Sequence, residues 1–353
     1  MSHIEIVSLS KSFGNKQIVK DINFKIKKCS FTVLLGPSGC GKSTILRIIS
    51  GLESPNSGKI LINGMDVTTK ASSKRGLSMV FQSYALFPHL SVKDNILFGL
   101  KVRKVNKKIQ EEKLNKAIKL VGLDEFLEKK PGQLSGGQKQ RVALARAFVA
   151  GHSICLMDEP LSNLDAKLRH EMRIEIKALQ KRLGMSVLYV THDQTEAMSM
   201  ADHVILLNNG TIEQQGTPQE LYQKVATIFI GSFIGTPPMN ILKLNNKEIQ
   251  TDNNQKAPLS YSNNTSVEDT YLGIRPEDAA ISRTEEGLKG TILFQDYHGS
   301  DTILGIKLES FATEKPFLVR IQGHDSHRIG DKIGIVWNED KIHIFDSNGK
   351  RKD

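Results

Sequence analysis

The chain has 353 residues, and its 48 Lys and Arg residues against 38 Asp and Glu residues give a formal net charge of +10. Hydrophobic residues at 39% and charged residues at 24% are ordinary for a globular protein, which excludes a disordered, collagen-like or coiled-coil chain. Three cysteines do not form a disulfide scaffold and suit a reducing compartment. The start lacks the features of a signal peptide, and no apolar run reaches about 18 residues, so we expect neither a leader nor a membrane-spanning helix.

Up to about residue 235, apolar strands alternate with amphipathic helices. A strand at 31–35 leads through a glycine-rich turn into a helix at 43–49, and a long helix at 166–183 precedes an apolar strand at 187–190. Continuous apolar strands are typical of a parallel sheet buried on both faces. The pattern therefore predicts an α/β domain over residues 1–235.

Turn signals punctuate the end of this domain. Asn208-Asn209-Gly210 predicts a hairpin, and Thr217-Pro218-Gln219-Glu220 predicts a capped helix start. Gly235-Thr236-Pro237-Pro238 cannot continue a helix, so a second domain is expected over 236–353. Its polar part at 243–268 is expected to be loosely ordered in places. A small β-barrel or sandwich is predicted by short strands at 291–294, 303–308, 317–321, 332–336 and 342–345.

A glycine-rich segment lies where the strand at 31–35 meets the next helix. It matches the phosphate-loop pattern G-x-x-x-x-G-K-[ST] and reads Gly36-Pro37-Ser38-Gly39-Cys40-Gly41-Lys42-Ser43-Thr44. Glycines let backbone N–H groups close around phosphate oxygens, and the helix N-terminus adds a positive dipole end. We expect Lys42 to reach the β- and γ-phosphates and Ser43 to bind Mg²⁺. A chance glycine-rich turn is the less favoured interpretation.

A second motif reads as a buried strand that ends in two carboxylates, Ile154-Cys155-Leu156-Met157-Asp158-Glu159-Pro160. Asp158 would hold Mg²⁺, often through water. Glu159 would act as general base or position the attacking water. A strand followed by a polar turn is common, so the motif by itself leaves both interpretations open. The phosphate loop in the same chain favours the catalytic one.

A third motif, Leu134-Ser135-Gly136-Gly137-Gln138, precedes an expected helix at 139–149. It would present a helix N-terminus to an anion, or it would simply cap the helix. Taken with the phosphate loop and the two carboxylates, in this order along the chain, the sequence closely resembles the ATP-binding cassette (ABC) ATPases. The resemblance implies ATP and Mg²⁺ as ligands.

The resemblance gives roles to residues that would mean little alone. Phe13 stands where the family has an aromatic residue that stacks on adenine, and Gln82 matches the glutamine that senses Mg²⁺ and the attacking water. His192 matches the switch histidine that contacts the γ-phosphate. Asp165 belongs to Ser162-Asn163-Leu164-Asp165, which matches the loop that crosses the dimer interface. Without the three strong motifs, Phe13 would be interpreted as a packing residue and His192 as a hydrogen-bonding residue, and Gln82 would carry no meaning.

In ABC ATPases two nucleotide domains face each other head to tail, so that each ATP lies between one phosphate loop and the other domain's signature segment, here 135–138. This chain has one such domain, so the resemblance implies a second copy as partner. ATP would close the dimer and hydrolysis would open it. The implied fold is an α/β P-loop ATPase domain with a helical subdomain at about 84–150. A small all-β regulatory domain of the oligonucleotide/oligosaccharide-binding type would follow.

Longer stretches resemble the ATPase subunits of bacterial importers for carbohydrates and related solutes such as glycerol-3-phosphate. They lie at 80–92, 160–169, 191–197, 233–240 and 272–278. The resemblance implies two transmembrane permease subunits and, indirectly, an extracytoplasmic solute-binding protein. It also implies a peripheral position on the cytoplasmic face of the cell membrane. A phosphonate, a polyamine or ferric ion stays open as the solute, because the ATPase does not touch it.

The segment after Gln82 is the expected coupling site. By resemblance, residues 84–90 would help form a cleft for a short helix of each permease, and Leu86 and Phe87 would suit that surface. Packing inside the helical subdomain is the alternative for both residues, and the sequence leaves the two interpretations open.

Two other classes of function compete with an importer ATPase. A nucleic-acid or ribosome-acting ABC ATPase usually has two cassettes or long inserted arms, and a dead regulatory ATPase would lack Lys42, Glu159 or His192. Residues 1–235 carry 33 Lys and Arg against 20 Asp and Glu, a net +13, whereas residues 236–353 carry 15 against 18, a net −3. We therefore expect no nucleic-acid partner. The basic excess, which includes 101–119, suits an anionic membrane face.

Overall fold

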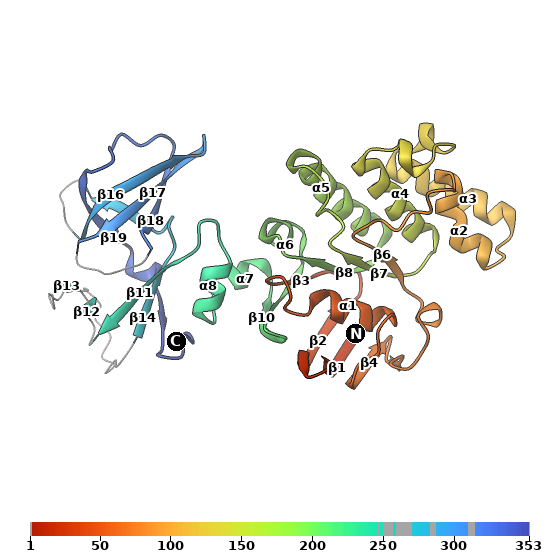
Figure 1. The fold of residues 1–353 in the computed structure, drawn as a ribbon, viewed down its shortest axis with the longest axis horizontal. Coiled ribbons are helices and arrows are strands. Elements are labelled where there is room, and N and C mark those ends of the chain that lie inside the picture. Colours follow the sequence, from red (N-terminus) through yellow and green to blue (C-terminus); the bar gives the residue numbers. More distant parts are fainter. Residues whose placement is uncertain are drawn as a thin grey trace. The chain divides into compact units, whose positions relative to one another are not determined.

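The computed structural model describes residues 2–245, 248–249, 257–258, 270–282, 287–309 and 315–352. Most of the polar segment expected to be loosely ordered, 243–268, lies outside these residues. The backbone forms two compact units, Met1–Gln219 and Glu220–Asp353 (Figure 1). None of the helices in the described ranges is long and apolar enough to cross a membrane.

A six-stranded sheet forms the centre of the first unit, in the order β10-β9-β3-β8-β7-β6. Its strands are β3 (Phe31–Leu35), β6 (Ser78–Val80), β7 (Ile154–Asp158), β8 (Ser186–Thr191), β9 (His203–Asn208) and β10 (Thr211–Gly216). All pairs are parallel except β9–β10, which is the hairpin predicted at Asn208-Asn209-Gly210. Every residue of β3 and β8 is buried, as predicted for strands covered on both faces.

A second, antiparallel sheet has the order β2-β1-β4-β5. Its strands are β1 (Ser2–Phe13), β2 (Lys16–Lys27), β4 (Ser57–Ile62) and β5 (Met65–Asp66). The sequence reasoning did not identify this sheet, because β1 and β2 mix buried apolar with exposed polar residues and their register shifts at several points. Such shifts interrupt the period of two that marks a half-buried strand.

The phosphate-loop helix α1 (Lys42–Ser50) packs between the two sheets. Its buried residues share one hydrophobic core with β1, β2 and β4 on one side and with β7, β8 and β9 on the other. The helices α5 (Ala166–Leu183) and α6 (Gln194–Met200) lie on the opposite face of the six-stranded sheet (Figure 1). The bounds of α5 agree with the predicted helix at 166–183, and Met172, Ile176 and Leu179 form its buried stripe.

Three helices form a helical subdomain where it was expected. They are α2 (Val92–Val102), α3 (Lys107–Val121) and α4 (Gly136–Val149); the short turns η2 (Asp124–Phe126) and η3 (Pro131–Gln133) connect α3 to α4, and η1 (Ser72–Lys74) precedes β6. Buried aliphatic residues of α2, α3 and α4 make a separate hydrophobic core. The basic segment at 101–119 runs from the end of α2 through α3.

The second unit contains two five-stranded antiparallel sheets, ordered β13-β12-β11-β14-β20 and β15-β19-β16-β17-β18. The first consists of β11 (Asn240–Asn245), β12 (Glu248–Ile249), β13 (Ala257–Pro258), β14 (Thr270–Ile274) and β20 (His343–Phe345). The second consists of β15 (Ala279–Ser282), β16 (Leu288–Tyr297), β17 (Asp301–Leu308), β18 (Phe317–Gln322) and β19 (Lys332–Trp337), and η4 (Glu339–Lys341) follows. Both sheets contribute to one core, which agrees with the predicted all-β domain.

The division between the units falls before the boundary expected at residue 235. The helices α7 (Pro218–Gln223) and α8 (Ile228–Phe233) connect the hairpin to the β-rich unit. The buried Arg275 side chain, at the end of β14, donates hydrogen bonds to the carbonyls of Ile234 and Tyr222. The sequence showed where a helix must end, but not that α8 packs with the strands that follow it.

Candidate active site

The phosphate loop joins β3 to α1, and its glycines are required by its backbone. A Cβ on Gly36, at φ 154°, would lie 2.3 Å from the carbonyl oxygen of Leu207, and one on Gly41, at φ 104°, would lie 3.0 Å from that of Ile18. Gly39, at φ 80°, faces open space, so its conformation and not its surroundings favours glycine. The exposed tip is formed by Ser38 and Gly39.

Lys42 is buried inside this loop. Its ammonium donates hydrogen bonds to the carbonyl oxygens of Gly36 and Pro37, at 2.8 Å each. The helix α1 begins at Lys42 with Gly41 as its cap residue, and no side chain caps it. A glycine-rich turn, a helix N-terminus and a lysine therefore converge, which is a combination that suits an anion. Burial raises the pKa of Cys40 despite the neighbouring Lys42, so its thiol is held neutral.

The first of the two carboxylates at the end of β7 meets the phosphate loop. Asp158 accepts a hydrogen bond of 2.8 Å from the Ser43 hydroxyl. Burial and the neighbouring Glu159 carboxylate raise the pKa of Asp158, whereas the Ser43 hydrogen bond opposes that rise. A cation bound to Asp158 would lower its pKa and so oppose the effects of burial and of Glu159. The half-buried Thr44 follows on the same helix.

The second carboxylate faces the end of β8. The Glu159 carboxylate lies 3.2 Å from Nδ1 of His192. Glu159 has a φ of 43°, which is rare for a residue with a side chain, and its backbone N–H donates to the carbonyl of Val190. The sheet thus places Asp158 and Glu159, neighbours in sequence, against two different partners.

Gln82 lies just beyond β6, which ends at Val80. Its side-chain amide donates to the Ser162 hydroxyl at 3.2 Å, and its carbonyl accepts from the Asn163 amide at 3.1 Å. The Ser162 hydroxyl in turn donates to the carbonyl of Glu159. A short hydrogen-bonded chain therefore connects Gln82 to the catalytic candidate Glu159.

Phe13 ends β1 at the hairpin turn and is half exposed. The ammonium of Lys11 lies 4.9 Å from the centre of its ring, a cation–π contact. A half-exposed aromatic ring is available for stacking, but no contact in the described structure joins it to the phosphate loop. Its role against adenine stays a prediction.

The signature segment, residues 135–138, makes hydrogen bonds and packing contacts within its own chain. Ser135 caps α4, because its hydroxyl accepts from the Gln138 N–H while the Gln138 side chain accepts from the Ser135 N–H. A Cβ on Gly136 would lie 3.1 Å from Leu164, and one on Gly137 would lie 2.8 Å from Leu168. The signature glycines therefore allow close approach of the segment that contains Asp165. Asp165 itself caps α5 by accepting from the Leu168 N–H.

Leu86 and Phe87 are half-buried. Leu86 packs against the core of the helical subdomain, and the Phe87 ring lies 4.3 Å from that of Phe98. Both side chains therefore take part in packing and keep an exposed part. The coupling role of Leu86 and Phe87 stays a prediction.

Two groups of residues escaped the sequence reasoning. Asp193 caps α6, and Glu196, buried in α6, accepts from the hydroxyls of Tyr189 and Thr191 at 2.8 and 2.7 Å. This network holds the turn that carries His192. Asp193 and Glu196 have the spacing of a capping box, which is a signal that could have identified the helix start.

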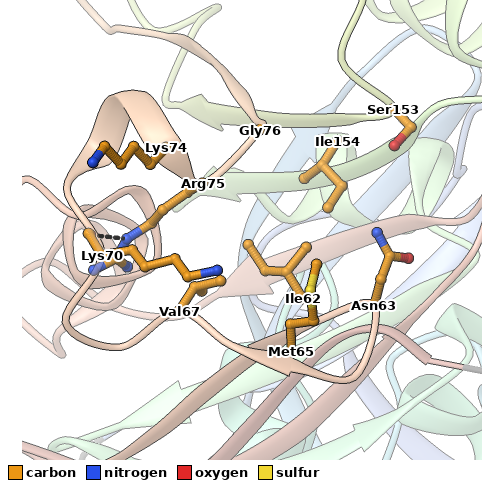
Figure 2. Close-up of a pocket in the computed structure, with 10 residues that line it drawn as sticks. All are labelled: Ile62, Asn63, Met65, Val67, Lys70, Lys74, Arg75, Gly76, Ser153 and Ile154. Carbon is orange, nitrogen blue, oxygen red and sulfur yellow. Dashed lines mark hydrogen bonds between the residues drawn. The ribbon is translucent and has the colours of Figure 1, made fainter.

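Arg75 is the second. It is buried and donates to the carbonyls of Ile48 and Ile49 at the end of α1 and to those of Lys70 and Thr68. It borders a cavity of about 220 Å³ that is lined by apolar, polar and basic side chains (Figure 2). The lining residues are Ile62, Asn63, Met65, Val67, Lys70, Lys74, Arg75, Gly76, Ser153 and Ile154. None is among the predicted site residues, and the Arg75 contacts point to support of α1.

The Ser43 hydroxyl and the Asp158 carboxylate fit a cation that prefers oxygen ligands and takes few of them from the protein. Among the described residues, no three His, Cys, Asp or Glu side chains lie close enough together to hold a metal ion. Mg²⁺ needs no such cluster, because it is usually bound by one or two protein oxygens together with phosphates and water. The adjacent oxygens of Ser43 and Asp158 are suited to that arrangement.

A phosphate loop at the head of a parallel sheet, an added antiparallel sheet and a helical subdomain define the class of P-loop ATPases with an ABC-type α/β domain. The comparisons with known proteins agree. The "ABC transporter" family matches residues 19–162, and the "TOBE domain" family matches residues 272–345, within the β-rich unit.

Relatives extend over the whole chain. The sn-glycerol-3-phosphate import ATP-binding protein UgpC of Brucella abortus is 43% identical, over 99% of both chains. The multiple sugar-binding transport ATP-binding protein MsmK of Streptococcus mutans is 41% identical, over 98% of both. The chain therefore belongs to the ATP-binding subunits of ABC transporters.

A solved structure supports the ABC-type fold. The cbiO1 protein of Clostridium perfringens, described as part of the ABC transporter complex cbiONQ, superimposes with a TM-score of 0.59 and 29% identity. The match covers 63% of this chain and 90% of that one. An ABC-type ATPase domain followed by a β-rich TOBE domain is thus the architecture of the chain, as the sequence predicted.

Proposed function

We propose that the chain is the ATP-hydrolysing subunit of a membrane importer for a carbohydrate or a related solute such as glycerol-3-phosphate. The observation that carries the proposal is identity above 40% along the full length to UgpC and MsmK, whose names state those solutes. The match to these relatives extends through the β-rich unit. The match to cbiO1 does not extend over the whole chain, because it covers 90% of cbiO1 but only 63% of this chain.

In this proposal, ATP phosphates are bound by the phosphate loop, residues 36–44. Lys42 exchanges its two carbonyl partners for phosphate oxygens, which are stronger acceptors because they are charged. Phe13 stacks on the adenine. Asp158 and Ser43 hold Mg²⁺, which supplies charge neutralisation at the phosphates when bound.

Glu159 is proposed as the general base for the attacking water. Its hydrogen bond to His192 orients the carboxylate, and the Ser162 link connects its backbone to Gln82. His192 and Gln82 would then contact the γ-phosphate and the metal–water shell respectively. This division assigns metal binding to one carboxylate and proton transfer to the other, in agreement with their different partners.

A second copy of the chain is proposed to complete the site. Ser135, Gly136, Gly137 and Gln138 would contact the ATP held by the partner, and Asp165 would lie at the dimer interface. The contacts of Gly136 and Gly137 with Leu164 and Leu168 support this, because they join the two interface elements. Two permeases would then dock near Leu86 and Phe87 on the cytoplasmic side of the membrane, with a solute-binding protein acting from outside. The β-rich unit would have a regulatory role.

The test is solute uptake in cells that lack this chain. Loss of uptake of labelled sn-glycerol-3-phosphate or of a labelled maltodextrin is expected. Plasmid-borne wild-type chain should restore it, and Lys42→Ala should not. Normal uptake of both, together with loss of phosphonate, polyamine or ferric-ion uptake, would show that the solute class is wrong.

A further inference from the structure

An arginine from the signature helix holds the backbone of the segment that follows Gln82. The Arg146 guanidinium, on α4, donates one hydrogen bond to the carbonyl of Tyr84 and one to that of Ala85, both at 2.6 Å. The partners are about sixty residues apart in sequence. One planar side chain therefore bridges two consecutive carbonyls.

The bridged residues have an unfavourable backbone conformation. Tyr84 has a φ of 64° and Ala85 a φ of 47°, in the left-handed region where a Cβ clashes with the backbone. Two such residues in succession persist only where their surroundings hold them. Hydrogen bonds from a charged guanidinium are among the stronger ones available for this purpose.

The same segment is held at a second point in the helical subdomain. The buried Asn95, on α2, accepts a hydrogen bond from the Phe87 N–H at 2.8 Å and donates to the Phe87 carbonyl at 3.1 Å. Gln82, in contrast, is bound to Ser162 and Asn163 beyond β7. The chain thus passes from the sheet to the helical subdomain between Gln82 and Tyr84.

We propose that Arg146 is a positioning residue for ATP hydrolysis and its coupling. It holds residues 84–85 in the left-handed conformation that keeps Gln82 against Ser162, and it ties Leu86 and Phe87 to the helix that begins with the signature segment. When the start of α4 moves, Arg146 would therefore move Leu86 and Phe87, the proposed permease contact, with it. The inference rests on the proposed roles of Gln82 and of the signature segment.

Chemistry distinguishes this role from general packing. A lysine ammonium can donate to two carbonyls, as that of Lys42 does, but it lacks the fixed planar pair of N–H groups that Arg146 directs at Tyr84 and Ala85, so Arg146→Lys should keep only part of kcat. Glycine adopts the left-handed region freely, so Ala85→Gly removes part of the need for the guanidinium. A glycine that repairs the loss of a distant arginine would not be expected if Arg146 only filled space.

The experiment measures steady-state ATP hydrolysis by the purified full-length chain. Arg146→Ala should lower kcat about tenfold to a hundredfold, as misplacement of a catalytic group does, and leave KM for ATP within about twofold. Ala85→Gly introduced into Arg146→Ala should restore most of kcat. If Arg146→Ala does not fold, Arg146→Lys, which keeps the charge and the alkyl stem, is measured in its place.

Arg141→Ala is the matched control. Arg141 is on the same helix, is half-buried, and donates to the carbonyl of Val121 while pairing with Glu175. It should keep kcat near the wild-type value. A wild-type kcat in Arg146→Ala, or a loss that Ala85→Gly does not repair, would overturn the inference. Absence of ATPase activity in the wild type would instead contradict the proposed function.

Discussion

The phosphate-binding edge of the sheet and the segment after Gln82 are built in different ways. At the edge, Lys42 begins a helix, Asp158 ends a strand and His192 directly follows one, so the local sequence positions them. Between residues 82 and 87, the backbone is instead held by side chains of the helical subdomain, Asn95 on α2 and the more distant Arg146 on α4. The comparison suggests that the chemical centre is fixed locally, whereas the coupling segment depends on how the helical subdomain packs.

The largest expected effect is at the edge. Glu159→Gln removes the proposed base but keeps its shape, so kcat for ATP should fall by roughly 10² to 10⁴ while ATP still binds. Phosphate release and equilibrium binding of ATP measure the two quantities. The exposed Glu171→Gln on α5 should keep wild-type turnover. Near-wild-type turnover in Glu159→Gln would remove Glu159 from the mechanism.

The next effect concerns Arg75, which binds the C-terminal end of the phosphate-loop helix α1. Arg75→Ala removes one hydrogen bond from each of four carbonyls, two of them at the end of α1, where a positive charge is also favoured. The free energy of unfolding should fall by about 3 kcal/mol, measured by urea denaturation. The exposed Lys74→Ala, on the same turn, should change it by less than about 0.5 kcal/mol. Equal effects of both variants would contradict the supporting role.

Leu86→Glu tests the coupling segment directly. Because Leu86 is only half-buried, the free energy of unfolding should fall by about 1–2 kcal/mol, and ATP hydrolysis by the purified chain should persist while solute uptake in cells is lost. Leu52→Glu, at an exposed leucine near α1, is the control and should support uptake. Loss of ATPase activity together with uptake would favour packing as the role of Leu86.

The smallest effect is a pH dependence at Glu196. Burial raises the pKa of this carboxyl above its ordinary 4.5, despite the hydrogen bonds from Thr191 and Tyr189; the facing Asp193 adds to the rise and Arg169 opposes it. The folded chain then binds a proton more readily than the unfolded chain. Its contribution to stability is therefore present below about pH 4.5 and is lost as pH rises through the raised pKa.

Glu196→Gln stays neutral and keeps an acceptor, so the fall in unfolding free energy across that pH range should be shallower than in the wild type. At pH 7 the two should agree to within about 1 kcal/mol. Urea denaturation at a series of pH values measures the difference. Parallel pH profiles for the two chains would mean that Glu196 does not titrate as its burial predicts.

The same contrast explains what could be predicted from the sequence. The glycine-rich turn before α1, the helix at 166–183 and the hairpin at 208–210 depend on neighbouring residues, and the structure confirms these elements, whereas phosphate binding at 36–44 stays a prediction. Arg75 and Arg146 donate hydrogen bonds to backbone carbonyls of residues far away in the sequence. Because every residue has a backbone carbonyl, the sequence does not indicate which ones these arginines bind. The antiparallel sheet was missed because register shifts interrupt the alternation of buried and exposed residues in its strands. The Gly-Pro signal after α8 marked the end of that helix, but it gave no indication that Arg275 of the β-rich unit bonds to the carbonyl of Ile234.

The most direct test of the central claim, that the phosphate-binding edge is an ATP site completed by a second copy, is the molar mass of Glu159→Gln in solution. Light scattering should show a dimer with saturating ATP and a monomer with ADP, because hydrolysis can no longer release the closed state. A monomer at saturating ATP, with binding of ATP shown independently, would contradict the account.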